Sequence, residues 1–421
     1  MPKRKEVPPD SDSDEESLAD SETDSDASEI DPDLEVEESD GGESQQDFLK
    51  PSKSYHRISD EYNCTQTKLE KDYEFSWVPG EKEYHENLCN ENLLTEKDKK
   101  MILSLSYVKL FELFFNTKLK NLIIDSTNEN GYPLTLEDLN RVIGFAVFTS
   151  FNTRSSQKDF WSRNPFLRAE PVAQAMSRNH YLKTKSALKY APSRDKNDED
   201  KIWRVRRMVE IFNENIMQFG IFTTALSIDE MMVKFYGRLV IKQFIKAKPI
   251  KFGIKEWGIC SANGYLFHFE IYCGKNSEKE VKLSKIAQGS RVVMRMLDQL
   301  LRKTASHKIG QYHVYFDNLF TCPDLLIHLK KLGLKSTGVV RNDRIQVENV
   351  FEKNAPRGTY AVQHEKNSGM NFISVQDSKK VSIISTAAGV TPLTTVQRYV
   401  KGEGRKDLQF PNAHREYPLL P

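Results

Sequence analysis

Two aspartates, Asp229 and Asp317, are the residues of this sequence best suited to chemistry. Each follows a β-rich run, Thr223–Ile228 or Tyr312–Phe316, and is predicted to lie at the C-terminal end of a strand. If the two strands are neighbours in a mixed sheet, both carboxylates lie at one edge. Paired carboxylates suit Mg²⁺, which prefers oxygen ligands, and two such ions can clamp a phosphodiester during its cleavage. Alternatively, each aspartate simply ends a strand and opens a turn.

A run of cations and aromatic residues follows Asp229. Between positions 231 and 255 there is no Asp or Glu, and the cations alternate with Phe and Tyr up to Trp257. This composition favours contact with a phosphate backbone and with unstacked bases, whereas a solvated basic face is the plainer alternative. Arg341 and Arg344, after a later strand, are further candidates for phosphate contacts or ordinary strand-end charges. The cations of the run are Lys234, Arg238, Lys242, Lys246, Lys248, Lys251 and Lys255.

The charges of the 421 residues are separated along the chain, although the formal net charge is only +1. Residues 1–47 carry 19 acidic and three basic residues, a net charge of −16, and the remainder carries +17. An acidic segment on a basic body predicts a nucleic-acid or other polyanionic partner. The short basic cluster Pro2–Lys5 resembles a nuclear import signal, and together with a nucleic-acid partner it leads us to expect a nuclear protein. Four hydroxyl residues with acidic residues downstream suit an acidophilic kinase, or else belong to a solvated tail: Ser11, Ser13, Ser17 and Thr23.

Two protein classes are not expected. No apolar run approaches the roughly 18 residues of a transmembrane helix, so we predict a soluble intracellular protein without a membrane partner. The cysteines are widely spaced, and no Cys or His pair has zinc-finger spacing. We therefore predict reduced thiols, with no disulfide framework and no zinc site in this chain. The five cysteines are Cys64, Cys89, Cys260, Cys273 and Cys322.

Composition and periodicity divide the chain into five parts. Residues 1–47 are predicted to be a disordered acidic tail, and residues 48–90 a linker. Residues 91–222 have helical periodicity, and residues 223–344 read as a mixed α/β layer. Residues 345–421 are more irregular, with one hairpin of Asn371–Val375 against Val381–Ile384.

Local signals place several elements within these parts. Thr95 is predicted to cap a helix, and the apolar stretch Tyr107–Phe115 is expected in the core. In the α/β layer, Lys255–Ile259 and Tyr265–Tyr272 form a hairpin around an Asn-Gly turn. Helices are predicted at about 290–303 and through Leu325, Leu326 and Leu329. No glycine-rich nucleotide-binding motif follows any strand.

At these residues the sequence resembles piggyBac transposases and piggyBac transposable element-derived proteins. The resemblance spans about residues 95–417. Trp161, Met176-Ser-Arg178 and the 202–218 helix fit the helical domain of that family. The core motifs that carry it are Leu226–Arg238, Lys242–Trp257, Gly264-Tyr265, Tyr272–Lys275, Tyr315–Thr321, Leu325-Leu326 and Thr337–Arg344.

The resemblance implies a ribonuclease-H-like catalytic core, preceded by an all-α DNA-binding and dimerisation domain. It also implies cut-and-paste DNA transposition at TTAA sites, Mg²⁺ as cofactor and homodimers on transposon-end DNA. Asp229 and Asp317 would be the first two of three metal-binding catalytic aspartates.

The sequence departs from the family pattern after Pro411–Tyr417. The family motif continues into a segment with the third aspartate, whereas this sequence reads Pro-Leu-Leu-Pro421. Asp377 and Glu403 lack the expected context. We therefore expect a transposase-derived DNA-binding protein with impaired catalysis. The alternatives are an active Mg²⁺-dependent transposase, if the chain is an incomplete gene product, and a chromatin-associated protein-interaction module whose acidic tail recruits partners.

Overall fold

The computed structural model describes seven stretches of the chain. The acidic segment 1–47, with its predicted disorder, kinase sites and nuclear import cluster, lies outside them, and so do Cys64, Cys89 and Glu403. Within the described stretches, no helix combines the length and the apolar composition needed to cross a bilayer. The described residues are 73–84, 90–246, 248–274, 287–301, 306–352, 355–400 and 404–416.

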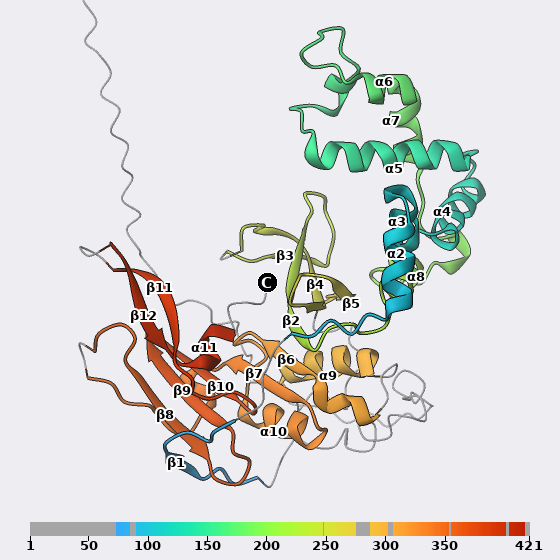
Figure 1. Cartoon of the computed structure of the whole chain (residues 1–421). Coiled ribbons are helices and arrows are strands. Elements are labelled where there is room, and N and C mark those ends of the chain that lie inside the picture. Colours follow the sequence, from blue (N-terminus) through green and yellow to red (C-terminus); the bar gives the residue numbers. More distant parts are fainter. Residues whose placement is uncertain are drawn as a thin grey trace, which may run out of the picture. The chain divides into compact units, whose positions relative to one another are not determined.

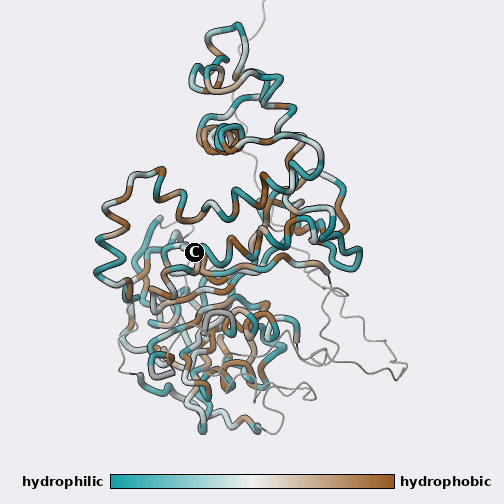
Figure 2. The backbone as a smooth tube through the Cα atoms, turned by 90° about the vertical axis from the view of Figure 1, so that its right-hand side faces the viewer, coloured by the Kyte–Doolittle hydropathy of each residue, from teal (hydrophilic) through white to brown (hydrophobic). Residues whose placement is uncertain are grey.

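Residues 96–216 are helical. Most of these helices begin after a Ser, Thr or Asn whose side-chain oxygen accepts a hydrogen bond from a backbone N–H of the first turn; the predicted cap Thr95 is one of them. Figure 2 shows hydrophilic and hydrophobic residues alternating along these helices, as expected for helices with one packed face. The helices are α2 (Glu96–Ser104), α3 (Tyr107–Phe114), α4 (Thr117–Glu129), α5 (Leu136–Phe151), α6 (Glu170–Ala175), α7 (Arg178–Ala187) and α8 (Trp203–Ile216).

The expectation that Tyr107–Phe115 lies in the core is wrong. None of the residues of α3 is fully buried, and Tyr107 is 91% exposed. Only one side of α3 packs: Phe114 meets the ring of Tyr265, with 6.2 Å between centroids, and its carbonyl accepts a hydrogen bond from Asn215. Apart from Lys109 and Glu112 the helix is apolar, but it packs on one side only, so Tyr107, Val108 and Phe111 remain exposed within the described residues.

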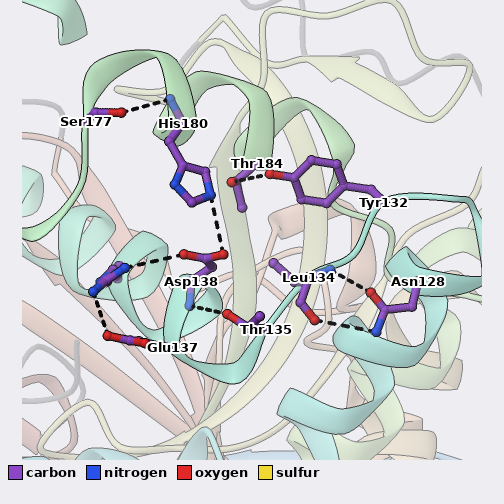
Figure 3. A network of polar contacts seen from close by, with 10 residues as sticks. Asn128, Tyr132, Leu134, Thr135, Glu137, Asp138, Ser177, His180 and Thr184 are labelled. Atoms are coloured by element: carbon purple, nitrogen blue, oxygen red, sulfur yellow. Dashed lines mark hydrogen bonds and ion pairs between the residues drawn. The ribbon is translucent and has the colours of Figure 1, made fainter.

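A polar network joins α5 to α7 (Figure 3). The hydroxyl of Thr135 accepts a hydrogen bond from the backbone N–H of Asp138 (3.1 Å). The buried Asp138 carboxylate in turn lies 3.3 Å from Nε2 of His180 on α7. The hydroxyls of Tyr132 and Thr184 form a second link of 2.7 Å. The start of α5 is therefore fixed both by its own cap and by α7.

Removal of this cap tests how much it stabilises the helical part. We expect Thr135→Ala to lower the free energy of unfolding by about 1 kcal/mol, because the N–H of Asp138 loses its acceptor. Ser150→Ala, at an exposed position inside α5, is the matched control and should change it by less than about 0.5 kcal/mol. Urea denaturation measures both; equal effects would show that the cap contributes nothing.

The α/β part is built on a ten-stranded mixed sheet (Figure 1). Its strand order is β1-β8-β9-β10-β7-β6-β2-β4-β3, with β5 paired to β4. β6 is parallel to β2 and to β7, and the other pairs are antiparallel. The strands are β1 (Trp77–Pro79), β2 (Ala225–Lys234), β3 (Lys242–Phe244), β4 (Phe252–Ser261), β5 (Leu266–Ile271), β6 (His313–Phe316), β7 (Lys335–Val339), β8 (Tyr360–Glu365), β9 (Asn371–Gln376) and β10 (Lys380–Ser385).

The largest apolar core lies between this sheet and two helices, α9 (Gln288–Leu301) and α10 (Pro323–Lys331). Both helices were predicted near these bounds. Ile228, Trp257 and Phe316 lie on the buried side of the central strands, each at most 1% exposed. The core therefore holds β2, β4 and β6 together at the place where the two candidate aspartates are found.

The predicted hairpins are confirmed. β4 pairs with β5 across the Asn263-Gly264 turn, where Gly264 has a φ of 81° that favours glycine. β9 pairs with β10, with Val375 opposite Val381. In contrast, part of the stretch expected to be a linker, 73–84, contains β1, which is held at the sheet edge by pairing with β8.

A smaller sheet of β11 (Thr394–Val400) and β12 (Gly404–Phe410) precedes helix α11 (Asn412–Glu416). Asp377, which the sequence left unassigned, connects the two sheets. Its carboxylate lies 2.6 Å from Arg357 and 3.0 Å from Arg398 on β11. Burial opposes ionisation, but the hydrogen bonds from both arginines outweigh it and lower the pKa of Asp377. This aspartate is therefore a structural ion-pair residue.

Candidate nucleic-acid interface and carboxylate edge

The structure brings Asp229 and Asp317 together. β2 and β6 are parallel neighbours with Ile228 opposite Phe316. Asp229 directly follows Ile228 in the sequence, and Asp317 directly follows Phe316. Asp317 follows the end of β6 as predicted and is exposed. Asp229 does not end its strand, as the sequence suggested: β2 continues to Lys234 because β4 pairs with it beyond the end of β6.

Some of the groups around Asp229 raise the pKa of its carboxyl, and others lower it. Burial raises the pKa of its carboxyl, and the negative charges of Asp317 and Glu230 act in the same direction. The backbone N–H of Glu230, which donates a hydrogen bond to Oδ1 of Asp229 (2.7 Å), and the charge of Lys248 oppose this rise. The two aspartates are thus close enough to repel each other, which is the arrangement that a shared cation relieves.

The loop after Asp317 is held by arginine. Nη1 of Arg344 donates hydrogen bonds to the carbonyls of Asn318 (2.7 Å), Leu319 (3.0 Å) and Thr321 (3.0 Å). Arg341 donates to the side-chain carbonyl of Asn318 (3.2 Å), and the N–H of Asn318 donates to Oδ1 of Asp317. Both arginines therefore lie beside Asp229 and Asp317, which we call the carboxylate edge. Arg344 already donates hydrogen bonds that hold the loop after Asp317.

The carboxylate edge fits part of a divalent-cation site. Asp229 and Asp317 supply oxygen ligands, which match the preference of Mg²⁺. Across the described residues, no group of three His, Cys, Asp or Glu side chains could hold a metal ion. Cys260 and Cys322 are free thiols.

Two of the predicted DNA-binding lysines form ion pairs with Glu230. Nζ of Lys255 lies 2.6 Å from one carboxylate oxygen of Glu230, and Nζ of Lys248 lies 3.4 Å from the other. Lys255 is also packed over Trp257, 4.1 Å from the ring centroid, and its side chain is only 15% exposed. The sequence did not reveal this role of Glu230, because it depends on the register of β2 and β4: Glu230 is opposite Trp257, and Lys255 is two residues from Trp257 on β4.

The other cations of the run lie on a ribbon that we define as residues 231–246 and 248–256: the outer half of β2, β3, the first half of β4 and the described parts of their connections (Figure 1). The ribbon is closely built, since a Cβ at Gly253 would overlap the carbonyl oxygen of Val233. Lys242 is half-buried and donates to the carbonyl of Gly237 (3.2 Å). The four exposed cations are Lys234, Arg238, Lys246 and Lys251.

The chain is similar to known proteins in sequence and in fold. The family model described as Transposase IS4 matches residues 106–418. The Homo sapiens PiggyBac transposable element-derived protein 3 is 31% identical over 320 residues, covering 73% of this chain and 53% of that protein. The human PiggyBac transposable element-derived protein 2 is 28% identical over 305 residues, covering 70% and 50%. The chain thus spans about half the length of these relatives.

A solved structure of piggyBac transposase, a synaptic complex with hairpin DNA, has a TM-score of 0.57 and 20% sequence identity. The match covers 70% of this chain and 63% of that chain. The predicted α/β fold with a mixed-sheet core is therefore confirmed. The chain belongs to the Transposase IS4 family, and its relatives are of the piggyBac type.

Proposed function

We propose that this transposase-derived chain binds DNA through the exposed cations of the ribbon. The observation that supports it most is the placement of Lys234, Arg238, Lys246 and Lys251: all four are exposed, and none is ion-paired within the described residues. Cations that are not neutralised by the protein can displace the counterions of DNA phosphates. With DNA as partner, nuclear localisation follows as part of the same proposal. Homodimers and phosphorylation of the acidic segment stay predictions.

The test is the salt dependence of DNA binding by the 421-residue chain. If four cations neutralise four phosphates, the logarithm of the affinity should fall with the logarithm of salt concentration at a slope of about −3 to −4. Fluorescence anisotropy with a labelled duplex measures this slope. Binding that does not weaken with salt, or no binding at low salt, would contradict the proposal.

We also propose that DNA cleavage at the carboxylate edge is impaired. Among the described residues, Asp229 and Asp317 match the first two of the three metal-binding aspartates that the family resemblance implies. They would hold Mg²⁺, which when bound supplies charge neutralisation at phosphate oxygens. Because catalysis of this kind depends on rigid positioning of the metal, a cation held by two carboxylates is poorly placed for it.

A nicking assay distinguishes this proposal from an active transposase. We expect supercoiled DNA to remain intact with the chain and Mg²⁺ or Mn²⁺, both for the parent sequence and for Asp229→Ala. DNA binding of both proteins, measured in the same buffer, shows that the substrate is engaged. Cleavage by the parent that disappears in Asp229→Ala would show that the edge is catalytic.

A further inference from the structure

Three aromatic rings of the ribbon are turned to solvent. Tyr236 is 78% exposed, Phe244 is 56% exposed and Phe252 is 49% exposed. Single exposed apolar residues are common on protein surfaces, but a group of aromatic rings on one protruding element marks an interaction site. The cations beside them indicate which partner the group suits.

Phe244 and Phe252 form a pair, and lysines accompany the rings. The two phenylalanines are directly opposite each other on β3 and β4, with 4.6 Å between ring centroids. Nζ of Lys242 lies 5.6 Å from the centroid of Phe252, and Nζ of Lys234 lies 5.2 Å from that of Tyr236. Each cation is thus within the distance at which it is attracted to an aromatic face. A ligand that stacks on these rings therefore meets positive charge at the same place.

The register relates the ring pair to the carboxylate edge. Asp229 is opposite Gly258 on β4, and Phe252 precedes Gly258 by six residues on the same strand. Because side chains alternate between the two sides of a strand, Phe252 is on the same sheet face as Asp229, about 20 Å along the strand. A nucleic-acid strand stacked on the ring pair would thus lie on the face of the carboxylate edge.

We propose that the ribbon binds unpaired nucleotides of DNA, stacking their bases on Phe244, Phe252 and Tyr236 while its lysines contact the phosphates. This inference rests on the proposed DNA-binding function. Bases of an intact duplex are stacked on one another and offer no open face to an aromatic ring. Unpaired bases have open faces, and base–aromatic stacking accepts any base. The rings therefore add a preference for DNA structure to the attraction supplied by the cations.

Two probes of nearly equal charge test this preference: a short perfect duplex and the same duplex with a central bulge of unpaired nucleotides. We expect the 421-residue chain to bind the bulged duplex about 10-fold more tightly, because stacking of one or two bases accounts for such a factor. The double variant Phe244→Ala with Phe252→Ala should bind both DNAs with equal affinity, because it lacks the rings on which unpaired bases stack. Fluorescence anisotropy at about 0.1 M salt measures all four combinations.

Further variants separate stacking from general apolar contact. Phe252→Trp should keep the preference, whereas the double variant Phe244→Leu with Phe252→Leu should lose it, although leucine is also apolar. Val240→Ala, at an 85% exposed aliphatic position of the ribbon, should change nothing. Urea denaturation verifies that each variant is folded. Retention of the preference in the leucine variant would overturn stacking as its cause.

The outcomes separate this inference from the proposed function. Equal binding of the two probes by the parent chain, with a normal salt slope, overturns the inference and leaves the proposed function intact. Failure to bind either probe overturns the proposed function, and the inference with it. Equal losses for both probes in the alanine double variant would leave its preference for the bulged duplex unchanged, assign the rings to general DNA contact and overturn stacking on them as the cause of the preference.

Discussion

We expect the replacement of Lys246 and Lys251 with glutamate to lower the affinity of the chain for duplex DNA by about 10- to 100-fold at about 0.1 M salt and to reduce the salt slope by about 2. Both lysines are exposed and have no ion-pair partner among the described residues, so the change acts on DNA binding and not on a contact of the fold. Each reversal removes a phosphate contact and adds repulsion. Anisotropy titrations at several salt concentrations measure the affinity and the slope together.

A charge-matched control distinguishes a local interface from general electrostatic attraction. Lys97 and Lys100 are exposed on α2, and their replacement by glutamate changes the net charge by the same amount. We expect a loss of less than about threefold and an unchanged slope, because the proposal assigns the phosphate contacts to the ribbon, and counterions screen charges that do not contact phosphates. Equal losses in the two double variants would mean that the ribbon is not the DNA surface.

Glu365→Gln lowers the free energy of unfolding by about 3 kcal/mol, since it removes charge from a fully buried carboxylate that accepts four hydrogen bonds. Its donors are the hydroxyl of Tyr73 (2.6 Å) and the backbone N–H groups of Ser76 (3.2 Å), Asn367 (3.1 Å) and Ser368 (2.6 Å). An amide has one oxygen acceptor and therefore leaves some of these donors unpaired. Urea denaturation at neutral pH measures the loss.

The pH dependence gives this prediction a second measurement. Burial alone would raise the pKa of Glu365, but the hydrogen bonds from Ser368, Tyr73 and Ser76 lower it to about 2. Because the folded pKa lies below the unfolded value of about 4.3, the stabilisation is complete above that pH and is lost as pH falls toward 2. Glu365→Gln should lack this decline. Glu348→Gln, at a 70% exposed side chain, is the control and should keep it.

Local sequence patterns predicted the elements well where one residue or a short run determines them. The cap at Thr95 and the Asn263-Gly264 turn are examples, since a hydroxyl acceptor or a positive φ is needed at one position. The adjacency of Asp229 and Asp317 was also predictable, because both follow β-rich runs. Parallel pairing of such runs brings their ends to one edge.

Features that depend on register or on distant pairing were not predictable. The extension of β2 past Asp229 follows from its pairing with β4. The ion pairs of Glu230 with Lys248 and Lys255 depend on the same pairing, and they separate two lysines of the basic run from the four that are exposed. Composition alone does not distinguish these cations, whereas the structure shows which of them are exposed and which are ion-paired to a carboxylate.

The expectation for α3 failed for a related reason. Apolar content predicts burial only if another element covers each face of a helix. For Tyr107 and Val108 the described residues supply no such cover, and both are exposed. The sequence of a helix does not show how many other elements pack against it.

Strand β1 has a consequence for how the protein is divided experimentally. Trp77–Pro79 pairs with Gln363–Glu365, so the outermost strand of the sheet comes from a segment that precedes the whole helical part. A fragment that begins after residue 90 leaves β8 with an open backbone edge, which invites intermolecular strand addition and aggregation. It also removes Tyr73 from Glu365. The helical part is thus an insertion between two pieces of one sheet, and the chain cannot be cut there into autonomous halves.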